Sequence, residues 1–273
     1  MGALTLLAGC SAQTQQEWSN LAMPEPATLE SPAVLDLWIW GWVAAMVVGV
    51  IVWGLIFWVV WRYRRRSPDE IPVQTRYNLP LEIFYTIAPI LMVVVFFYWT
   101  VKVQNDVLDE ETRPSQYSVY VVGQQWSWTF NYPDQEVVGG EGTNVYVSGT
   151  AADPPTLVLP VDTTVTFELR AADVIHGFWV PAFLMKMDVF PGRENSFQVT
   201  PTTEGTFKGK CTELCGVYHS RMLFNVDVVS QAEFEEYLQG LQSQGFVSEE
   251  PILGGKYTTT PVGMDDTEEG GEG

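Results

Sequence analysis

The sequence predicts two membrane-spanning helices followed by an all-β domain on the outer side of the membrane. Three observations lead to this fold class. Two long stretches near the N-terminus carry no charged residue, and an arginine-rich loop separates them. From about Val103 onward, short strand-like runs are separated by turn residues such as Gly and Pro. The 273 residues suffice for a membrane anchor and one folded domain.

The two charge-free stretches are Leu37–Trp61 and Ile83–Val101. A helix needs about 20 apolar residues to cross a bilayer, and each stretch reaches across the hydrocarbon at about 1.5 Å per residue. Tryptophans at both ends of the first stretch are typical of interfacial belts, although helix packing against a neighbouring subunit would also explain them. We therefore assign residues 36–103 to a transmembrane helical hairpin.

The loop between the two helices, residues 62–80, determines the expected orientation. It contains five of the 14 basic residues, namely Arg62, Arg64, Arg65, Arg66 and Arg76. Loops rich in Lys and Arg stay in the cytoplasm. The loop is therefore expected inside the cell, and both termini outside.

The N-terminus contains Leu7-Ala8-Gly9-Cys10, which resembles the lipobox of bacterial lipoprotein signal peptides. Only nine residues precede Cys10 and none is basic, unlike an ordinary signal peptide. Either the true start codon lies upstream and Cys10 is lipidated, or the match is chance. We interpret residues 1–9 as a lipoprotein signal remnant and residues 10–35 as an extracytoplasmic linker.

The charge of the chain limits its partners. With 33 acidic and 14 basic residues the formal net charge is −19. Nucleic acid is excluded as a partner, because its phosphates need a basic surface. A basic protein partner suits this charge if the acids gather on one face.

The outer domain is expected to be a β-sandwich or barrel. Trp126, Trp128, Phe130 and Tyr132 alternate and should share one face of a strand. Residues 133–155 are rich in Gly, Asp, Pro and Thr and are predicted to form a long loop. The predicted strands are Tyr117–Val122, Trp126–Tyr132, Leu157–Leu159, Val165–Arg170, Gly177–Val180, Ser196–Thr200, Gly205–Lys210 and Leu223–Val229.

A terminal helix is expected after the last strand. Ser230 and Glu233 have the spacing of a capping box, and apolar residues then recur at helical intervals from Phe234 to Leu241. Residues 244–273 end in Gly and acid, a composition that predicts a flexible tail.

The stretch CTELCGVYHSRM, residues 211–222, concentrates potential metal ligands. With Cys10 set aside, every Cys and His belongs to one group that also includes a Met: His176, Cys211, Cys215, His219 and Met222. Thiolate, imidazole and thioether together are the soft set that selects copper, and two thiolates can bridge two ions. A zinc site and a Cys211–Cys215 disulfide remain open at this point.

The chain resembles subunit II of cytochrome c oxidase, of the haem–copper oxidase family, from about Leu37 to the terminal helix. CTELCGVYHSRM resembles the dinuclear copper loop C-x-E-x-C-x3-H-x2-M of that family, and DVIHGFWVP, MDVFPGR and GQQWSW resemble further family motifs. The resemblance implies a cupredoxin-like Greek-key fold for residues 104–243, with a dinuclear copper centre and a terminal helix. Residues 133–155 and those beyond 245 have no match in the family pattern.

The resemblance also implies a role for each ligand. Cys211 and Cys215 would be the bridging thiolates, and His176 and His219 would each bind one copper. The remaining ligands of the two copper ions would be the Met222 thioether, as a weak axial ligand, and the backbone carbonyl of Glu213.

Further roles implied by the resemblance concern residues outside the copper pair. The Glu213 side chain would reach a magnesium ion shared with subunit I. Trp126 would be the point at which electrons enter, and Glu82 would stand at the mouth of a proton channel. Plainer alternatives are a solvated acid, a core or surface aromatic, and a carboxylate facing water. Asp173 would support the copper site or donor docking, whereas Lys186 and Asp188 would face subunit I.

The implied function is that of subunit II of an aa3-type cytochrome c oxidase. It would accept electrons from a c-type cytochrome and pass them to haem in subunit I, which reduces oxygen to water and pumps protons. The lipobox and acidity favour a bacterial plasma membrane and an actinobacterial branch, in which the donor can be tethered in a bc1–oxidase supercomplex. There are three alternatives to this function. A quinol oxidase subunit would lack these ligands, and a nitrous oxide reductase would need an added propeller for which the chain has neither length nor pattern. A copper-bearing nitric oxide reductase is harder to exclude, and an anchored copper chaperone or zinc module would need neither Trp126 nor Glu82.

Overall fold

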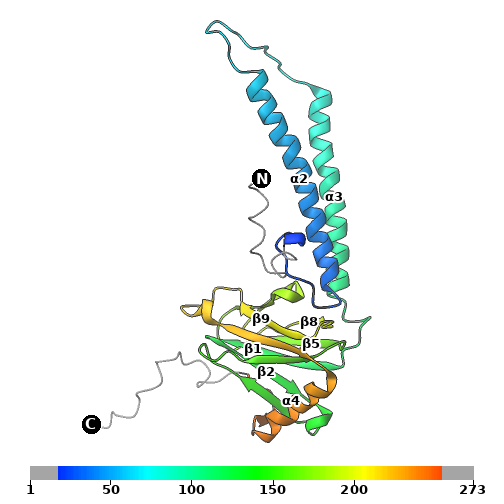
Figure 1. Ribbon diagram of the computed structural model, residues 1–273, viewed down its shortest axis with the longest axis vertical. Coiled ribbons are helices and arrows are strands. Elements are labelled where there is room, and N and C mark those ends of the chain that lie inside the picture. The colour runs from blue at the N-terminus through cyan, green and yellow to red at the C-terminus, as the bar shows by residue number, and fades with distance from the viewer. Residues whose placement is uncertain (1–17, 254–273) are drawn as a thin grey trace, which may run out of the picture. The chain divides into compact units, whose positions relative to one another are not determined.

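The computed structural model describes residues 18–253 and divides the chain into two compact units. One unit is a helical hairpin, Ala33–Asp106. The other combines the residues before it with those from Val107 onward and contains all the strands (Figure 1). Cys10 and residues 254–273 lie outside the described part of the chain.

The hairpin consists of α2 (Ser31–Arg62) and α3 (Leu79–Val107), both long and apolar enough to cross a membrane. Apolar side chains along both helices are largely exposed, as expected for surfaces that lie in lipid or against other membrane helices. Both helices are longer than the charge-free stretches. Backbone hydrogen bonding continues through flanking polar residues that need not lie in hydrocarbon, such as Asp36 and Lys102.

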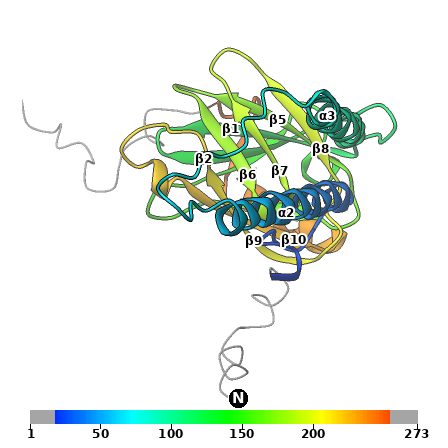
Figure 2. The same cartoon turned by 90° about the horizontal axis from the view of Figure 1, so that it is seen from above.

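The outer unit is a sandwich of two β-sheets (Figure 1 and Figure 2). The first sheet has the order β11 (Val247–Ser248), β3 (Asn144–Ser148), β2 (Ser127–Pro133), β1 (Tyr117–Gln124), β5 (Val165–Ala171) and β8 (Asn195–Val199). The second has the order β4 (Thr156–Pro160), β10 (Leu223–Val229), β9 (Gly205–Cys211), β6 (His176–Val180) and β7 (Met185–Val189). The chain crosses repeatedly between the sheets, so β1 pairs parallel with β5, and β4 with β10. This is the cupredoxin-like Greek-key arrangement.

Aromatic side chains fill the space between the sheets. Trp128 and Phe130 on β2 are fully buried and pack edge-on against Phe224, while Phe178 stacks on Phe224 at 4.9 Å. The predicted alternation is confirmed for Trp128, Phe130 and Tyr132, whereas Trp126 precedes β2 and is half-buried. The opposite face is buried as well, because Asn131 exchanges hydrogen bonds with the backbone of Ile252.

The structure differs from the sequence prediction between residues 133 and 155. The segment contains a short 3-10 helix, η2 (Glu136–Val138), and the strand β3, so it is not one long loop. β3 is held between β2 and β11, which gives its backbone partners on both sides. The sequence analysis also omitted β7 and β11, which are five and two residues long.

The predicted terminal helix is α4 (Gln231–Ser243), and its capping box is confirmed. The Ser230 hydroxyl accepts from the Glu233 backbone N–H, while the Glu233 carboxylate accepts from the Ser230 backbone N–H. The helix buries Phe234, Leu238 and Leu241 against the sandwich, where it contacts β3 and β4. Tyr237 meets the buried Tyr132 at 6.1 Å.

The residues just before α2 belong to the sandwich rather than to a free linker. Ala27 N–H donates to the carbonyl of Ala182, and Leu29 N–H donates to that of Thr200. The buried Glu30 carboxylate pairs with Arg113 and accepts a hydrogen bond from the Thr200 N–H. Because Arg113 follows α3 closely, this ion pair joins the two chain segments that flank the hairpin.

Candidate metal centre

Two strands bring the predicted ligands together. His176 begins β6 and Cys211 ends β9, and these strands pair with Phe178 opposite Cys211. The pairing extends into the loop, because Thr212 N–H donates to the Gly177 carbonyl at 3.0 Å. A Cβ on Gly177 would lie 2.3 Å from Thr212 Oγ1, so a side chain there would push the strands apart.

Residues 211–222 form a hairpin loop between β9 and β10, called here the metal loop. The Cys211 N–H donates to the Met222 carbonyl at 3.0 Å and closes the loop at its base. The loop contains a short 3-10 helix, η4 (His219–Arg221). The loop thus brings Cys215, His219 and Met222 back toward Cys211.

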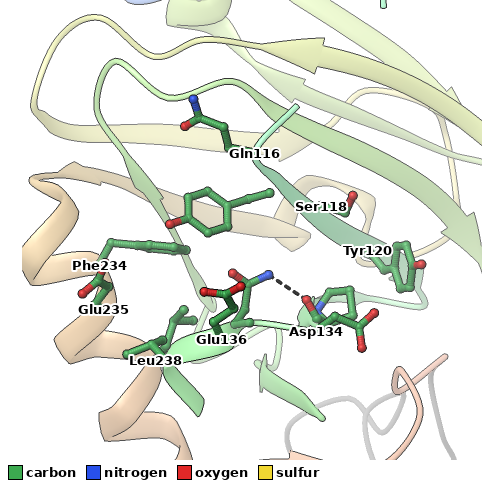
Figure 3. Close-up of a pocket in the computed structure, with 12 residues that line it drawn as sticks. Gln116, Ser118, Tyr120, Asp134, Glu136, Phe234, Glu235 and Leu238 are labelled. Carbon is green, nitrogen blue, oxygen red and sulfur yellow. Dashed lines mark hydrogen bonds between the residues drawn. The ribbon is translucent and has the colours of Figure 1, made fainter. Parts of the chain in front are cut away.

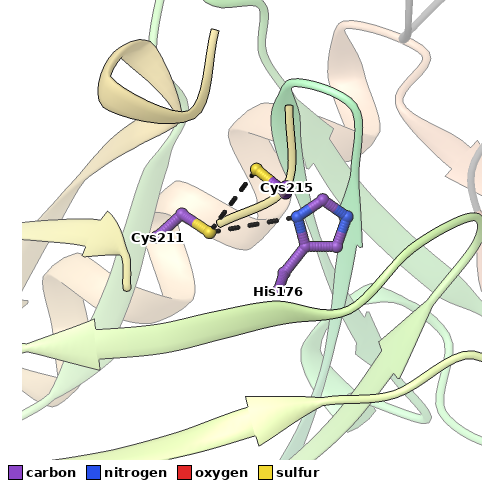
Figure 4. A group of neighbouring side chains, drawn as sticks. All are labelled: His176, Cys211 and Cys215. Carbon is purple, nitrogen blue, oxygen red and sulfur yellow. Dashed lines mark hydrogen bonds between the residues drawn. The ribbon is translucent and has the colours of Figure 1, made fainter. Parts of the chain in front are cut away.

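The two thiols face each other with 3.8 Å between the sulfur atoms, and both cysteines are free. His176 Nδ1 lies 3.9 Å from Cys211 Sγ (Figure 4). The ligand atoms of His176, Cys211 and Cys215 all fall within 4.8 Å of one another and could hold a metal ion.

Three further donor atoms lie around this group. His219 Nδ1 is 3.6 Å from Cys215 Sγ, and Met222 Sδ is 3.8 Å from the same sulfur. The Glu213 carbonyl oxygen lies 3.2 Å from Cys211 Sγ, while the Glu213 side chain is exposed. All six predicted donors therefore meet at one place.

Four of the donor residues are buried, whereas His219 is half-buried. His176 and Met222 have no exposed surface, and Cys211 and Cys215 are 5% and 4% exposed. The pKa of Cys211 is lowered, because its hydrogen bonds to Cys215 and to the His176 ring outweigh the effect of burial. The pKa of Cys215 is raised by its hydrogen bond to Cys211 and by burial. A bound cation would favour the thiolate form of both residues.

Asp173 orients the His176 ring. Burial lowers the pKa of His176, but hydrogen bonds to Cys211 and Asp173 outweigh burial and raise it overall. His176 Nε2 lies 2.9 Å from Asp173 Oδ1, which leaves Nδ1 facing the sulfur atoms. A carboxylate on the second nitrogen of a histidine ligand fixes its tautomer and raises its basicity.

Trp126 lies beside the metal loop, and its indole N–H donates to the Cys215 carbonyl at 3.3 Å. The preceding Gln125 donates its side-chain amide to the same carbonyl at 2.7 Å, and its backbone N–H to Asp173 Oδ2. The Trp126 ring also packs edge-on against Tyr218, with 5.1 Å between centroids. The sequence analysis assigned no role to Gln125 or Tyr218, although both occur in the motifs GQQWSW and CTELCGVYHSRM.

The remaining predicted residues do not join this group. Lys186 and Asp188 lie on β7, opposite Trp179 and Gly177 of β6. Glu82 lies in the first turn of α3, where its carboxylate accepts from the Asn78 backbone N–H at 2.9 Å. Glu82 therefore caps its own helix, whatever else it does.

A hollow of about 870 Å³ lies beside the first residues of β1 (Figure 3). The metal loop instead contacts Gln125 and Trp126, which follow the other end of this strand. Tyr117, Tyr120, Asp134, Glu136 and Phe234 contribute to its wall. None of the residues predicted as copper ligands lines it, so the two places are separate.

Fold and site together define a membrane-anchored protein whose outer cupredoxin-like domain presents a thiolate, imidazole and thioether cluster. Residues 117–229 match the family model for the periplasmic domain of cytochrome c oxidase subunit II. A probable cytochrome c oxidase subunit 2 of Streptomyces coelicolor is 45% identical over 272 residues, covering 88% of this chain and 85% of the relative. Cytochrome c oxidase subunit 2 of Mycobacterium tuberculosis H37Rv is 36% identical, covering 88% and 79%.

A solved structure, the periplasmic domain of subunit II of cytochrome oxidase of Bradyrhizobium japonicum, shares 29% identity at a TM-score of 0.43, covering 48% of this chain and 96% of that one. On the strength of the curated relatives, the chain belongs to the cytochrome c oxidase subunit II family. It is a component of cytochrome c oxidase, with other oxidase subunits as partners. The hairpin anchors it in the membrane, and the β-sandwich is the periplasmic domain.

Proposed function

We propose that the outer domain holds a dinuclear, mixed-valence copper centre and receives electrons from a c-type cytochrome. The observation that carries the proposal is the convergence of both thiols, two imidazoles and one thioether within 3.9 Å of a cysteine sulfur. The donor set fits copper, since thioether is a poor ligand for zinc and suits soft ions. Cys211 and Cys215 would bridge the ions, and His176 and His219 would each hold one.

The other two groups that would hold the ions are the Met222 thioether, as a weak ligand, and the Glu213 carbonyl. When bound, the copper pair would supply one-electron transfer with charge shared over two ions. The protein holds the thiolates in a buried site that excludes water, and Asp173 holds the His176 ring with Nδ1 directed inward. A fixed ligand cage of this kind keeps the reorganisation on electron transfer small.

Electrons would reach the centre through Trp126. The half-buried indole contacts the loop that carries the ligands, and its N–H donates directly to the carbonyl of Cys215. A donor touching the outer edge of the ring would thus be one hydrogen bond from the residue of a bridging thiolate. From this domain the electrons would pass to haem in subunit I of an aa3-type oxidase, which reduces oxygen to water and pumps protons.

Two carboxylates would serve the partner subunit. The exposed Glu213 side chain is free to reach a magnesium ion at the border with subunit I, while its carbonyl faces Cys211. Glu82 would deliver protons at the mouth of a channel in subunit I. It stands at the end of α3 next to the arginine-rich loop, which we place in the cytoplasm.

We further propose that both termini lie outside a bacterial plasma membrane and that Cys10 carries a lipid anchor. The actinobacterial relatives favour a donor tethered in a bc1–oxidase supercomplex over a freely diffusing one. Mass spectrometry of the intact subunit and of a Cys10→Ala variant would test the lipid. Equal masses, apart from the substitution itself, would contradict lipidation without touching the copper assignment.

The copper assignment is tested by metal analysis and EPR on the purified oxidase. We expect two coppers per outer domain and a hyperfine pattern from two equivalent copper nuclei. Cys215→Ser should lose this signal and the oxidation of cytochrome c, because one bridge is removed. The matched control is Ser220→Ala, an exposed serine in the same loop. Zinc in the site, or a normal signal from Cys215→Ser, would overturn the proposal.

A further inference from the structure

Trp126 touches the metal loop at several places. Its indole N–H donates to the Cys215 carbonyl at 3.3 Å, which is slightly longer than the usual range for such a hydrogen bond. Gly216 has a φ of +127°, and a Cβ there would come within 3.0 Å of the indole ring. The backbone of the metal loop therefore packs against the indole, but this contact alone does not fix the tilt of the ring.

The aromatic ring of Tyr218 packs against the Trp126 indole. The two aromatic planes meet at 81° with 5.1 Å between centroids, the edge-to-face geometry that aromatic pairs prefer. Tyr218 directly precedes η4, and its carbonyl accepts the Arg221 N–H at 2.8 Å. The Arg221 guanidinium lies 5.8 Å from the Tyr218 ring centroid. The ring is thus held by the short helix that also carries His219.

We propose that Tyr218 is a positioning residue that fixes the Trp126 indole against the metal loop, in the orientation from which electrons enter the centre. The inference rests on the proposed role of Trp126 and deepens it. Tyr218 acts through Trp126 and need not carry the electron itself. The path from the indole N–H through the Cys215 carbonyl to its sulfur is already direct.

The ring of Tyr218, rather than its hydroxyl, makes the contact with Trp126. Phenylalanine should therefore replace it fully, which provides a matched control. Losing an aromatic pair lowers the population of the held indole by roughly 2- to 10-fold, and electron transfer through it should slow by the same factor. The copper signal should stay unchanged, since Tyr218 is not among the donors.

The position of the ring is tested by 19F NMR on the full chain in detergent micelles, labelled with 5-fluorotryptophan and kept reduced. Trp126→Phe identifies the resonance. We expect wild type and Tyr218→Phe to share one resonance position, and Tyr218→Leu to show a shifted, motionally averaged line. Tyr218→Gln is a second variant suited to this half-exposed position, should the leucine variant fail to fold. A Trp126 resonance that stays at the wild-type position in Tyr218→Leu or in Tyr218→Gln would overturn the proposal.

Kinetics on the purified oxidase then separate this inference from the proposed function. Reduction by a soluble basic cytochrome c with a photoactive ruthenium label should slow in Tyr218→Leu and be normal in Tyr218→Phe. Reduction by hexaammineruthenium(II), which can reach the centre by other routes, should be equal in all variants. If the indole moves but neither Tyr218→Leu nor Trp126→Phe slows the cytochrome reaction, the positioning role stands and the electron-path assignment of Trp126 fails.

Discussion

At the scale of single residues, the carboxylate of Asp173 connects His176 with the segment that carries Trp126. Asp173 accepts from His176 Nε2, from the backbone of Gln125 and from that of Val174. One carboxylate thus fixes both the histidine ligand and the segment that carries Trp126. The Asp173 side chain is 25% exposed, so part of its charge is still solvated.

Asp173→Asn should weaken metal binding while leaving the fold intact. An amide cannot hold the His176 ring in the required tautomer as well as a carboxylate, and losses of this kind cost about 10- to 100-fold in metal affinity. Competition with a copper chelator, followed by the visible spectrum, measures the change. Glu194→Gln, an exposed acid paired only with Arg170, is the control. Equal affinity in Asp173→Asn and wild type would rule out this orienting role.

At the scale of elements, α4 packs onto the sandwich through two tyrosines. Tyr132 is fully buried, with its hydroxyl bound to both the N–H and the carbonyl of Val158. Burial raises the pKa of Tyr132 and that of Tyr237 above the ordinary value of 10.0. The folded chain therefore retains protons that the unfolded chain releases.

Stability should fall as the pH rises above about 10, by up to about 1.4 kcal/mol per pH unit for each tyrosine. The sign follows because the raised pKa makes the folded state bind more protons than the unfolded state in this range. Denaturant unfolding of the full chain in micelles, repeated at increasing alkaline pH, measures the slope. Tyr237→Phe should lower the slope, and an unchanged slope would show that Tyr237 ionises normally.

At the start of α3, the Glu82 carboxylate makes a contact within its own helix and has a proposed role in proton uptake. Glu82 caps the helix by accepting from the Asn78 N–H, and Asn78 in turn accepts from the Leu81 N–H. Glu82→Gln keeps an oxygen acceptor for the cap but removes the charge, whereas Glu82→Ala removes both. If Glu82 supplies protons, both variants should slow proton uptake during turnover by a similar factor. A defect confined to the alanine variant would mean that capping is the whole role.

Sequence patterns predicted best those features that depend only on residues close together in the chain. The two apolar helices and the capping box of α4 depend on local spacing, and the structure contains them as predicted. The metal loop depends on local spacing too, and three of the predicted ligands, His176, Cys211 and Cys215, lie close enough to hold a metal ion. β3 was missed because its short Val-Tyr-Val pattern lies between Gly-rich and Pro-rich stretches that read as loop, and its pairing with β2 and β11 is what stabilises it. The packing of Trp126 against Tyr218 joins residues 92 positions apart, which spacing cannot predict.

At the scale of the whole molecule, the sandwich is tied to both chain segments that flank the membrane hairpin. Glu30 comes just before α2, its side chain is only 4% exposed, and it pairs with Arg113 after α3. Arg113 also donates to the carbonyls of Val107 and Asp109 at the end of that helix. The ion pair thus connects segments 83 residues apart in sequence.

Glu30→Ala should destabilise the outer domain by about 3 kcal/mol, because it removes the carboxylate partner of a partly buried Arg113 and an acceptor of the Thr200 N–H. Glu30→Gln keeps the acceptor and should lose less. Thermal unfolding and limited proteolysis before α2 measure the two effects. Proteolysis at the wild-type rate in Glu30→Ala would contradict a structural role for the pair.

The closed base of the metal loop also bears on how such a protein can change over generations. The Cys211 backbone N–H donates to the Met222 carbonyl where β9 meets β10. All the predicted donors except His176 lie within the loop that this hydrogen bond closes. The sandwich supplies the strands on either side, and the metal loop connects two adjacent strands over a short, continuous stretch of sequence. A short recombination event could therefore replace five of the six predicted donors of the domain, while leaving folding and membrane attachment in place.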